Sequence, residues 1–392
     1  MAPVGIICPV CGGNEVVDVL SLADLPVAIN AQTTPELAPD VPKGDMNLVV
    51  CQSCAHLFNA SFDPELSDYD ASYENTLHFS PHFQRHATEL ADRLVADFEL
   101  AGATVAEAGS GPGHFLTMLV EAGAGAANGF DPSYDPERLG APEHPDVQLS
   151  SDLYPDDGSL NPRLALTQHV LEHLTDPVGL LGTLRGSVAA DEKGAVYSEV
   201  PNGEVMIDRC ALWDLIYEHY SYFTTASLSL ALTRAGLSTD RVETMFDDQF
   251  LAIESRPAEP EPGAELDADA VEALVARAVA FGDTARKQIE AAKGDLARYR
   301  AAGPVALWGA GSKGMTYLNL VAPGGEIDAV VDVNPRKAGF GVPGVGVAIS
   351  GPESLREIQP ATVLIANPIY ADEIRGTLAE LGVSAEVLPL WE

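Results

Sequence analysis

Two parts of the chain share one pattern of hydrophobic and polar positions: a short apolar run, a glycine-rich turn, and a segment with apolar residues at helical spacing. The first lies at residues 105–123 and the second at 304–321. Further apolar runs follow each part, at 126–130, 164–168 and 195–202 after the first and at 327–331, 361–365 and 385–391 after the second. Such runs, alternating with helical segments, predict two α/β units built on parallel sheets.

The segment between the two units has a different pattern. It opens with the Pro- and acid-rich SRPAEPEPGAELDADA and continues as a long amphipathic helix, VEALVARAVAFGDTARKQIEAAKGDLARYRAA. We interpret it as an arm that joins two domains. The expected division is an N-terminal module over 1–65, a core domain over 66–255, the linker and long helix over 256–302, and a C-terminal α/β domain over 303–392.

Charge narrows the classes of partner. The 392 residues include 22 Lys and Arg against 58 Asp and Glu, for a formal net charge of −36. Nucleic acids and anionic membranes are bound through basic surfaces, so neither is an expected partner. The sequence has no run of eighteen apolar residues and no basic-then-apolar N-terminal pattern. We expect a cytoplasmic protein that acts as a monomer.

Four of the five cysteines form two close pairs in the N-terminal module. Cys8 with Cys11 and Cys51 with Cys54 each make a CxxC motif, which presents two thiolates from one tight turn. Two such turns are typical of a structural, tetrahedral zinc site. The alternative is a redox CxxC, for which one pair would suffice. The fifth cysteine, Cys210, is expected to be a core thiol.

The first glycine turn indicates a nucleotide-like ligand. Gly109, Gly111 and Gly113 permit positive φ and a close ligand approach, and the free N–H groups of the following helix face the same crevice. A dinucleotide fingerprint needs a third glycine at the sixth place, where this turn has His114, so adenosine without a pyrophosphate is favoured. Asp131 follows about 20 residues later, where a carboxylate binds ribose hydroxyls.

Two later apolar runs are followed by further candidate residues at their carboxyl ends. Asp152 and Leu153 in VQLSSDLYP are expected to contact the adenine ring, and a solvated loop acid is the alternative for Asp152. LALTQHVLEHLTDP carries His169 and His173, which should face both cofactor and substrate because ligands bind at the carboxyl ends of such strands. Packed core histidines are the alternative there.

An aromatic-rich stretch, LIYEHYSYFTTASL, contains the charged pair Glu218 and His219. An imidazole titrates near neutrality, which suits a general base. An aromatic cluster closing the sheet would explain the rings but not the charged pair. Thr224 or Thr225 is expected to cap the next helix. Upstream, Tyr73 is a candidate for the pocket wall, and packing between domains explains it equally well.

The second glycine turn, WGAGSKGM, does match GxGxxG through Gly309, Gly311 and Gly314, and Asp332 follows about 20 residues later. This spacing supports an alternative function, an NAD-dependent dehydrogenase or epimerase. However, Lys313 lies within the turn, and the domain is short for a full dinucleotide fold. The other interpretation is an oxyanion or phosphate at the helix N-terminus, assisted by Lys313.

These motifs, in this order, resemble those of a known family. EAGSGPGHFL resembles the first motif of class I S-adenosylmethionine-dependent methyltransferases. Together with it, the stretches CPVC, CQSC, HVLEHLTDP, EHYSYF, WGAGSKGMTYLN and VDVNPRKAGFGVPG resemble the nucleotide-sugar C-methyltransferases, which act on dTDP-linked 4-keto deoxysugars in antibiotic and polysaccharide pathways. The resemblance implies a Rossmann-like class I methyltransferase core between a zinc module and a C-terminal Rossmann-like domain that helps to bind the nucleotide-sugar.

The resemblance also implies roles for single residues. His219 is the base that forms an enolate, Glu218 is a sugar ligand or proton partner, and His173 with Tyr222 or Tyr73 stabilises the enolate. The residues expected to bind S-adenosylmethionine are Glu107, Gly109, Gly111, Gly113, Phe115, Asp131, Asp152, Leu153 and His169. The residues expected to bind the nucleotide-sugar are Lys313 and Asn319.

The chain departs from the family pattern at identifiable places. Ile216 stands where the family has an active-site tyrosine, Tyr217 where it has a histidine, and Gly111-Pro112-Gly113 where it commonly has Asn-Asp-Gly. The missing tyrosine motivates an alternative within the class, O- or N-methylation of a nucleotide-linked sugar. A non-catalytic, zinc-bearing adaptor is a third class of function, and it predicts no cofactor binding.

Overall fold

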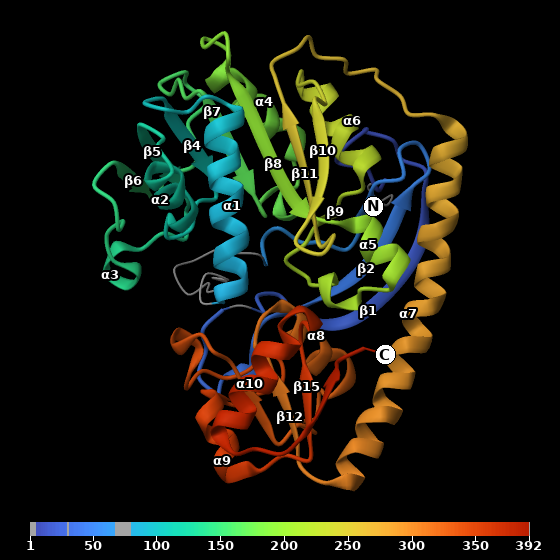
Figure 1. Cartoon of the computed structure of the whole chain (residues 1–392). Coiled ribbons are helices and arrows are strands. Elements are labelled where there is room, and N and C mark those ends of the chain that lie inside the picture. The colour runs from blue at the N-terminus through green and yellow to red at the C-terminus, as the bar shows by residue number, and fades with distance from the viewer. Residues whose placement is uncertain (1–4, 30, 67–79, 392) are drawn as a thin grey trace.

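In the computed structural model, which describes residues 5–29, 31–66 and 80–391, the chain forms three β-sheets (Figure 1). The central and C-terminal α/β sheets lie at opposite ends of the molecule, and the N-terminal sheet lies beside their junction. No helix within these ranges is long and apolar enough to span a bilayer.

The N-terminal sheet is antiparallel and takes its fourth strand from the middle of the chain. Its strands are β1 (Val16–Pro26), β2 (Lys43–Cys51), β3 (Leu57–Asn59) and β9 (Ser221–Tyr222). Leu57 pairs with Tyr222 and Phe58 with Ser221. A short 3-10 helix, η1 (Ala38–Asp40), lies between β1 and β2. The sheet therefore connects the CxxC module to the segment that carries Glu218 and His219.

The central sheet has seven strands in the order β10-β11-β8-β7-β4-β5-β6. Strands β4 to β8 are parallel, and β11 runs antiparallel to β8. Starting from β4, the chain adds β5 and β6 on one side of the sheet and then β7 and β8 on the other, so the strand order changes direction between β4 and β7. In such sheets, ligands bind in the crevice at this switch point. The strands are β4 (Thr104–Ala108), β5 (Ala126–Phe130), β6 (Val147–Ser150), β7 (Leu164–Gln168), β8 (Ala195–Pro201), β10 (Arg241–Met245) and β11 (Phe250–Ser255).

Helices cover both faces of this sheet (Figure 1). The helices of this part of the chain are α1 (Pro81–Asp97), α2 (His114–Glu121), α3 (Pro136–Leu139), α4 (Pro177–Val188), α5 (Gly203–Arg209) and α6 (Thr225–Ala235), with the 3-10 helices η2 (Leu171–His173) and η3 (Leu212–Asp214), of which α5 packs on α7 and η3 on α8. Thr224 caps α6 as predicted: its hydroxyl accepts a hydrogen bond from the N–H of Ser227, whose own hydroxyl accepts from the N–H of Thr224.

The C-terminal sheet is parallel, in the order β14-β13-β12-β15-β16, and it reverses between β12 and β15. Its strands are β12 (Val305–Trp308), β13 (Ala329–Val331), β14 (Ile349–Ser350), β15 (Thr362–Ile365) and β16 (Glu386–Pro389). Its helices are α8 (Ser312–Val321), α9 (Leu355–Ile358) and α10 (Ala371–Leu381), with η4 (Pro335–Lys337), η5 (Pro352–Ser354) and η6 (Pro368–Tyr370).

Helix α7 (Ala268–Ala302) runs along the molecule from the central sheet to the C-terminal sheet (Figure 1). The side chain of Asp267 caps its first turn by accepting from the N–H of Ala270 at 3.0 Å. Its buried apolar stripe packs on β1 and α8. A Cβ at Gly282 would lie 2.0 Å from the main-chain oxygen of Val19, so only glycine allows the helix to approach β1 this closely.

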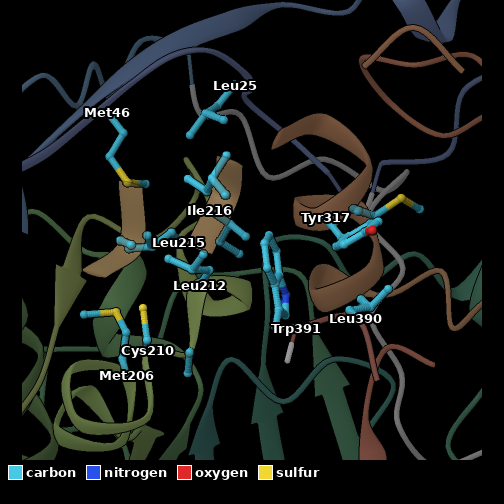
Figure 2. Close-up of a cluster of buried hydrophobic side chains, with 14 of the residues drawn as sticks. Leu25, Met46, Met206, Cys210, Leu212, Leu215, Ile216, Tyr317, Leu390 and Trp391 are labelled. Atoms are coloured by element: carbon cyan, nitrogen blue, oxygen red, sulfur yellow. The ribbon is translucent and has the colours of Figure 1, made fainter. Parts of the chain in front are cut away.

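One hydrophobic cluster contains residues of all three domains (Figure 2). Its last member along the chain is Trp391, which is 8% exposed and packs edge-on against Tyr317 with ring centroids 5.0 Å apart. Cys210 lies in the cluster, as expected of a core thiol. The residues labelled in Figure 2 are Leu25, Met46, Met206, Cys210, Leu212, Leu215, Ile216, Tyr317, Leu390 and Trp391.

Candidate active site

A cavity of about 840 Å³ lies between the central and C-terminal sheets. The glycine turn after β4 and the glycine turn after β12 both line it. His169, His173 and His219 line it as well. The ligand-binding ends of two parallel sheets therefore open onto one space, with three imidazoles in its wall.

The turn after β4 leaves room for a ligand against its backbone. Gly109, Gly111 and Gly113 have φ values of 77°, 51° and 75°, which side chains other than glycine rarely adopt. A Cβ at Gly111 would meet no atom within 4 Å, whereas one at Gly113 would lie 2.9 Å from Leu149. Gly111 thus borders open cavity, and Gly113 is required for packing.

Asp131 fixes this turn from the end of β5. Its Oδ2 accepts from the N–H of Gly111 at 2.7 Å, and its Oδ1 accepts from the N–H of Ser133 at 2.8 Å and from the Ser133 hydroxyl at 2.6 Å. Oδ2 retains one lone pair, so Asp131 can still accept from a ribose hydroxyl. That role stays a prediction.

Glu107 is the buried acid of the turn. It is 3% exposed and lines the cavity near the end of β4. Burial, together with the carboxylates of Asp131 and Glu199, raises the pKa of Glu107 to about 8. A ligand ammonium placed there would favour the ionised carboxylate. Phe115, on α2, lines the same cavity.

The two predicted adenine contacts differ in position. Leu153 lines the cavity and is 76% exposed, which leaves its side chain available to a ligand. Asp152 is not among the lining residues. Strand β6 ends at Ser150, so Asp152 lies in the following loop, where its carboxylate accepts from the Ser150 hydroxyl at 2.6 Å.

His169 bridges two buried carboxylates. Its Nε2 lies 3.1 Å from Oε1 of Glu199, and its Nδ1 lies 3.6 Å from Oε1 of Glu172. Burial alone would lower the pKa of His169, but the two nearby carboxylates have the larger effect and raise it to about 10. His169 is therefore an imidazolium at neutral pH. Because both ring nitrogens face protein carboxylates, a cofactor would contact the ring carbons.

His173 and His219 form a neutral pair. Their ring centroids lie 4.9 Å apart, with the rings at 73°. Nδ1 of His173 lies 2.9 Å from the main-chain oxygen of Glu218, which makes this nitrogen the N–H donor and leaves Nε2 with the lone pair. Burial lowers the pKa of both imidazoles, that of His219 to about 3.

The side chains of Glu218 and Tyr222 do not line the cavity. Oε2 of Glu218 accepts from the N–H of Ile29 at 3.2 Å, in the N-terminal module. The hydroxyl of Tyr222 donates to the main-chain oxygen of Ile216 at 3.2 Å. Tyr73 lies outside the described residues. Their catalytic roles stay predictions, and the main chain of Glu218, rather than its carboxylate, contacts His173.

The turn after β12 has the same features as the glycine turn after β4. Gly309 has a φ of 109°, and Oδ2 of Asp332 accepts from the N–H of Ala310 at 2.6 Å. A Cβ at Gly314 would lie 2.0 Å from the main-chain oxygen of Gly309, so α8 needs glycine there. A Cβ at Gly311 would meet no atom within 4 Å, and its φ of −96° suits any residue.

Lys313, in the first turn of α8, has unusual partners for a half-buried cation. Its Nζ donates to Oε1 of Gln249 and lies 5.2 Å from the centre of the Trp213 ring. Burial lowers the pKa of Lys313, and the more distant carboxylates of Asp214 and Asp247 oppose that shift. A neutral amide and an aromatic face therefore hold this ammonium group at the cavity wall.

Asn319 does not line the cavity. Its Nδ2 donates to the main-chain oxygens of Met315 at 2.9 Å and Pro343 at 3.1 Å. This amide joins α8 to the loop that follows η4. The predicted role of Asn319 in substrate binding would therefore have to be indirect, and it stays a prediction.

The four paired cysteines come together in the N-terminal module. Sγ of Cys8 lies 3.6 Å from that of Cys54, Sγ of Cys11 lies 3.5 Å from that of Cys51, and all four lie within 4.8 Å of one another. In a tetrahedral site with Zn–S distances of about 2.3 Å, the sulfur atoms are about 3.8 Å apart. The cluster is compatible with a small zinc site.

Three residues that line the cavity were not identified from the sequence: Glu172, Glu199 and Gln249. Glu172 and Glu199 are 2% and 3% exposed, and both contact His169. Glu172 follows β7, and Glu199 lies near the carboxyl end of β8. Because ligands bind at the carboxyl ends of parallel strands, the rule that pointed to the histidines would have pointed to these two residues as well. Gln249 gave no such signal, because its partner Lys313 lies in another domain.

Two family models match the chain. Residues 83–242 match a methyltransferase domain, and residues 269–385 match the C-methyltransferase C-terminal domain. No curated protein sequence was found to match.

Several solved structures are similar to part of the chain. An S-adenosylmethionine-dependent methyltransferase from Mesorhizobium loti is 18% identical, with a TM-score of 0.35 over 43% of this chain and 97% of that one. Magnesium protoporphyrin IX methyltransferase from Synechocystis PCC 6803, with bound SAH, is 18% identical, with a TM-score of 0.34 over 44% and 83%. The 1,6-didemethyltoxoflavin-N1-methyltransferase from Burkholderia thailandensis is 17% identical, with a TM-score of 0.34 over 46% of this chain and 82% of that one.

The domain matches agree with the sheet order and with the glycine turn at its switch point. The chain is thus a class I, S-adenosylmethionine-dependent methyltransferase that carries the C-terminal domain of the C-methyltransferases.

Proposed function

We propose that this enzyme methylates a carbon atom of a keto-deoxysugar linked to a nucleoside diphosphate. The observation that carries the proposal is that one cavity is lined by both glycine turns and by three histidines. The turn after β4 serves the methyl donor, and the turn after β12 serves the phosphates of the acceptor. The histidines serve the reacting carbon.

The residues of the first turn fit the methyl donor. Gly111 borders open space, as a ligand lying against the backbone requires, and Asp131 keeps an acceptor position for a ribose hydroxyl. Glu107 would receive the ammonium of the methionine moiety, and Leu153 would cover the adenine. When bound, S-adenosylmethionine supplies an electrophilic methyl group, so the protein has chiefly to align and activate the acceptor.

The second turn fits an anionic acceptor. The ammonium of Lys313 is partnered by the neutral amide of Gln249, so its charge remains available to an anion. The N-terminal N–H groups of α8 lie in the same turn and favour negative charge. In a protein with a formal net charge of −36, a cation whose hydrogen-bond acceptor is an amide and not a carboxylate favours a phosphorylated ligand.

His219 is the proposed base. A ketone next to the acceptor carbon acidifies its C–H bond, a base takes the proton, and hydrogen-bond donors stabilise the enolate oxygen. Because burial holds the pKa of His219 at about 3, its imidazole is neutral throughout the physiological range, which is the form that a base must have before it takes a proton. The predicted residues Tyr222 and Tyr73 would act as donors to the enolate oxygen, His173 would do so once its Nε2 is protonated, because its Nδ1 already faces the main-chain oxygen of Glu218, and Glu218 would assist at the sugar.

We further propose that the four cysteines hold a structural zinc ion. Their Sγ spacing is what a tetrahedral ion requires, and the N–H of Gly13 donates to Sγ of Cys11 at 3.3 Å, as it would to a thiolate. Such a site would stabilise the strand β3, with which β9 pairs directly after His219.

A panel of keto-deoxysugar nucleotides with S-adenosylmethionine tests the function. The expected result is a mass gain of one methyl group, with loss of deuterium from a deuterated acceptor carbon. Methylation that retains the deuterium would show O- or N-methylation. Binding of NAD without methylation would favour a dehydrogenase and would overturn the proposal.

A further inference from the structure

Glu172 is a buried carboxylate among three histidines. It lies in η2, directly after β7, and is 2% exposed at the cavity wall. Its Oε1 lies 3.6 Å from Nδ1 of His169. One of its oxygens, a ring nitrogen of His173 and a ring nitrogen of His219 all lie within 4.8 Å of one another. Across the described residues, its Oε2 has no hydrogen-bond partner.

The charges around Glu172 do not cancel. His169 lowers the pKa of Glu172 despite its burial, so Glu172 is anionic. The same His169 imidazolium also neutralises Glu199, whose pKa it lowers as well. Two carboxylates thus share one cation, and one negative charge remains next to the neutral histidine pair. An uncompensated buried charge is unfavourable until a proton or cation joins it.

His219 is the neighbour best placed to receive that proton. It is 8% exposed, and its Nδ1 has no hydrogen-bond partner among the described residues. Burial and the nearby rings of His173 and His169 oppose its protonation, whereas Glu172 and, to a smaller extent, the main chain of Asp214 favour it. Of the other titratable groups, Tyr222 has its ring centroid 5.9 Å away, and the Glu218 carboxylate is bonded to Ile29.

We propose that Glu172 is a positioning residue for the base, and that its carboxylate stabilises the imidazolium formed when His219 takes the proton of the acceptor carbon. The inference rests on the proposed function for its chemical step. In that step the C–H bond breaks, its electron pair enters the enolate, and the proton forms an N–H bond on His219. Glu172 neither gives nor receives an atom.

The arrangement resolves a difficulty in the proposed mechanism. Burial alone makes His219 a weak base, because it disfavours the imidazolium. A fixed carboxylate beside the ring lowers the energy of the protonated form when solvent is excluded, and it selects the neutral tautomer whose N–H faces the carboxylate.

Glu172→Gln tests the inference, with Glu172→Asp as the conservative variant and Glu107→Gln as a control that replaces another buried carboxyl group of the cavity. The ring ¹⁵N shifts of His219, assigned with His219→Gln, report its tautomer without any substrate. We expect Glu172→Gln to change these shifts, and Glu172→Asp and Glu107→Gln to preserve them. With a methylated acceptor, we expect Glu172→Gln to lower kcat about tenfold or more while KM changes little, and Glu172→Asp to recover part of the loss.

Three results would overturn the inference. The first is a His219 tautomer that is the same in Glu172→Gln as in the wild type. The second is an equal loss of kcat in the Gln and Asp variants, which would indicate packing alone. The third is a second metal ion per chain that Glu172→Gln removes, which would make Glu172, His173 and His219 metal ligands. If no acceptor is methylated, the proposed function fails, while the tautomer measurement still decides the inference.

Discussion

Lys313 donates a hydrogen bond to Gln249, and this contact joins the C-terminal domain to the central domain at the cavity wall. It pairs a half-buried cation with a neutral acceptor. The neutrality of Gln249 matters because a carboxylate in its place would neutralise the positive charge of Lys313, with which an anionic substrate would pair.

Gln249→Glu should therefore weaken binding of a nucleoside diphosphate about tenfold or more, since the new carboxylate would compete for Lys313. Gln249→Met, which removes the amide without adding charge, should bind within about threefold of the wild type. Calorimetric titration measures both. An equal loss in the two variants would show that the amide itself, and not the neutrality of the site, matters.

The two glycine turns can be blocked separately. Gly311→Ala meets no neighbouring atom and no backbone strain, so it should preserve stability and donor binding but prevent acceptor binding. Gly111→Ala should prevent donor binding, at an additional cost of about 1 kcal/mol for its positive φ. Equilibrium dialysis with each ligand and thermal melts separate these effects. Loss of both ligands in Gly311→Ala would contradict the assignment of the turns.

Glu107 makes stability and donor binding depend on pH in opposite ways. Its pKa in the folded state is about 8, above the ordinary value of 4.5, so ionisation destabilises the ligand-free fold as pH rises between these values. Glu107→Gln should raise Tm more at about pH 8.5 than at about pH 5. A melting temperature difference that does not grow with pH would contradict this assignment.

Donor binding should release protons. Because an ammonium favours the carboxylate form of Glu107, binding of S-adenosylmethionine near neutral pH should expel the proton that Glu107 holds. Calorimetry in buffers of different ionisation enthalpy measures the release. The Glu107→Gln variant should show less of it, and an unchanged release would assign the proton to another group.

The zinc proposal predicts about one zinc ion per chain. Cys51→Ala should lose it, whereas Cys210→Ala should retain it because Cys210 lies in the hydrophobic cluster. Loss of the ion should also lower methyl transfer, since β3 of the same module pairs with β9 beside His219. Elemental analysis and activity assays test both statements, and full activity in zinc-free protein would contradict the second.

Local patterns predicted the parts of the fold that depend on neighbouring residues. Helical periodicity over residues 271–302 corresponds to α7, and the polar residue Thr224 caps α6. The strand-end rule brought His169 and His173 to the cavity. Contacts between distant segments were not predictable in this way. The pairing of β9 with β3 and the bond of Lys313 to Gln249 depend on how whole domains pack.

Individual side-chain roles were the least predictable feature of the site. The charged pair Glu218 and His219 is adjacent in sequence, yet only His219 lines the cavity. The turn before β9 directs the two side chains to different surroundings, and the Glu218 carboxylate reaches Ile29 of the N-terminal module. Sequence adjacency carried no information on these directions.

Trp391 should contribute strongly to the stability of the domain junction. Trp391→Ala would leave a void beside Tyr317 and should lower the free energy of unfolding by about 3–5 kcal/mol. Leu37→Ala, at a side chain 62% exposed, should change it by less than about 0.5 kcal/mol. Denaturant titration followed by circular dichroism gives both values, and a loss as small as that of Leu37→Ala would contradict the packing role.

The position of Trp391 also bears on the order of events during synthesis. The cluster that it completes includes Leu25 and Met46, which leave the ribosome more than three hundred residues earlier. The N-terminal sheet must wait for β9 as well, so its edge strand β3 stays unpaired on the nascent chain until the central domain emerges. Such an exposed strand is prone to aggregate, which makes the interval between the first and last residues the period when chaperone protection matters most.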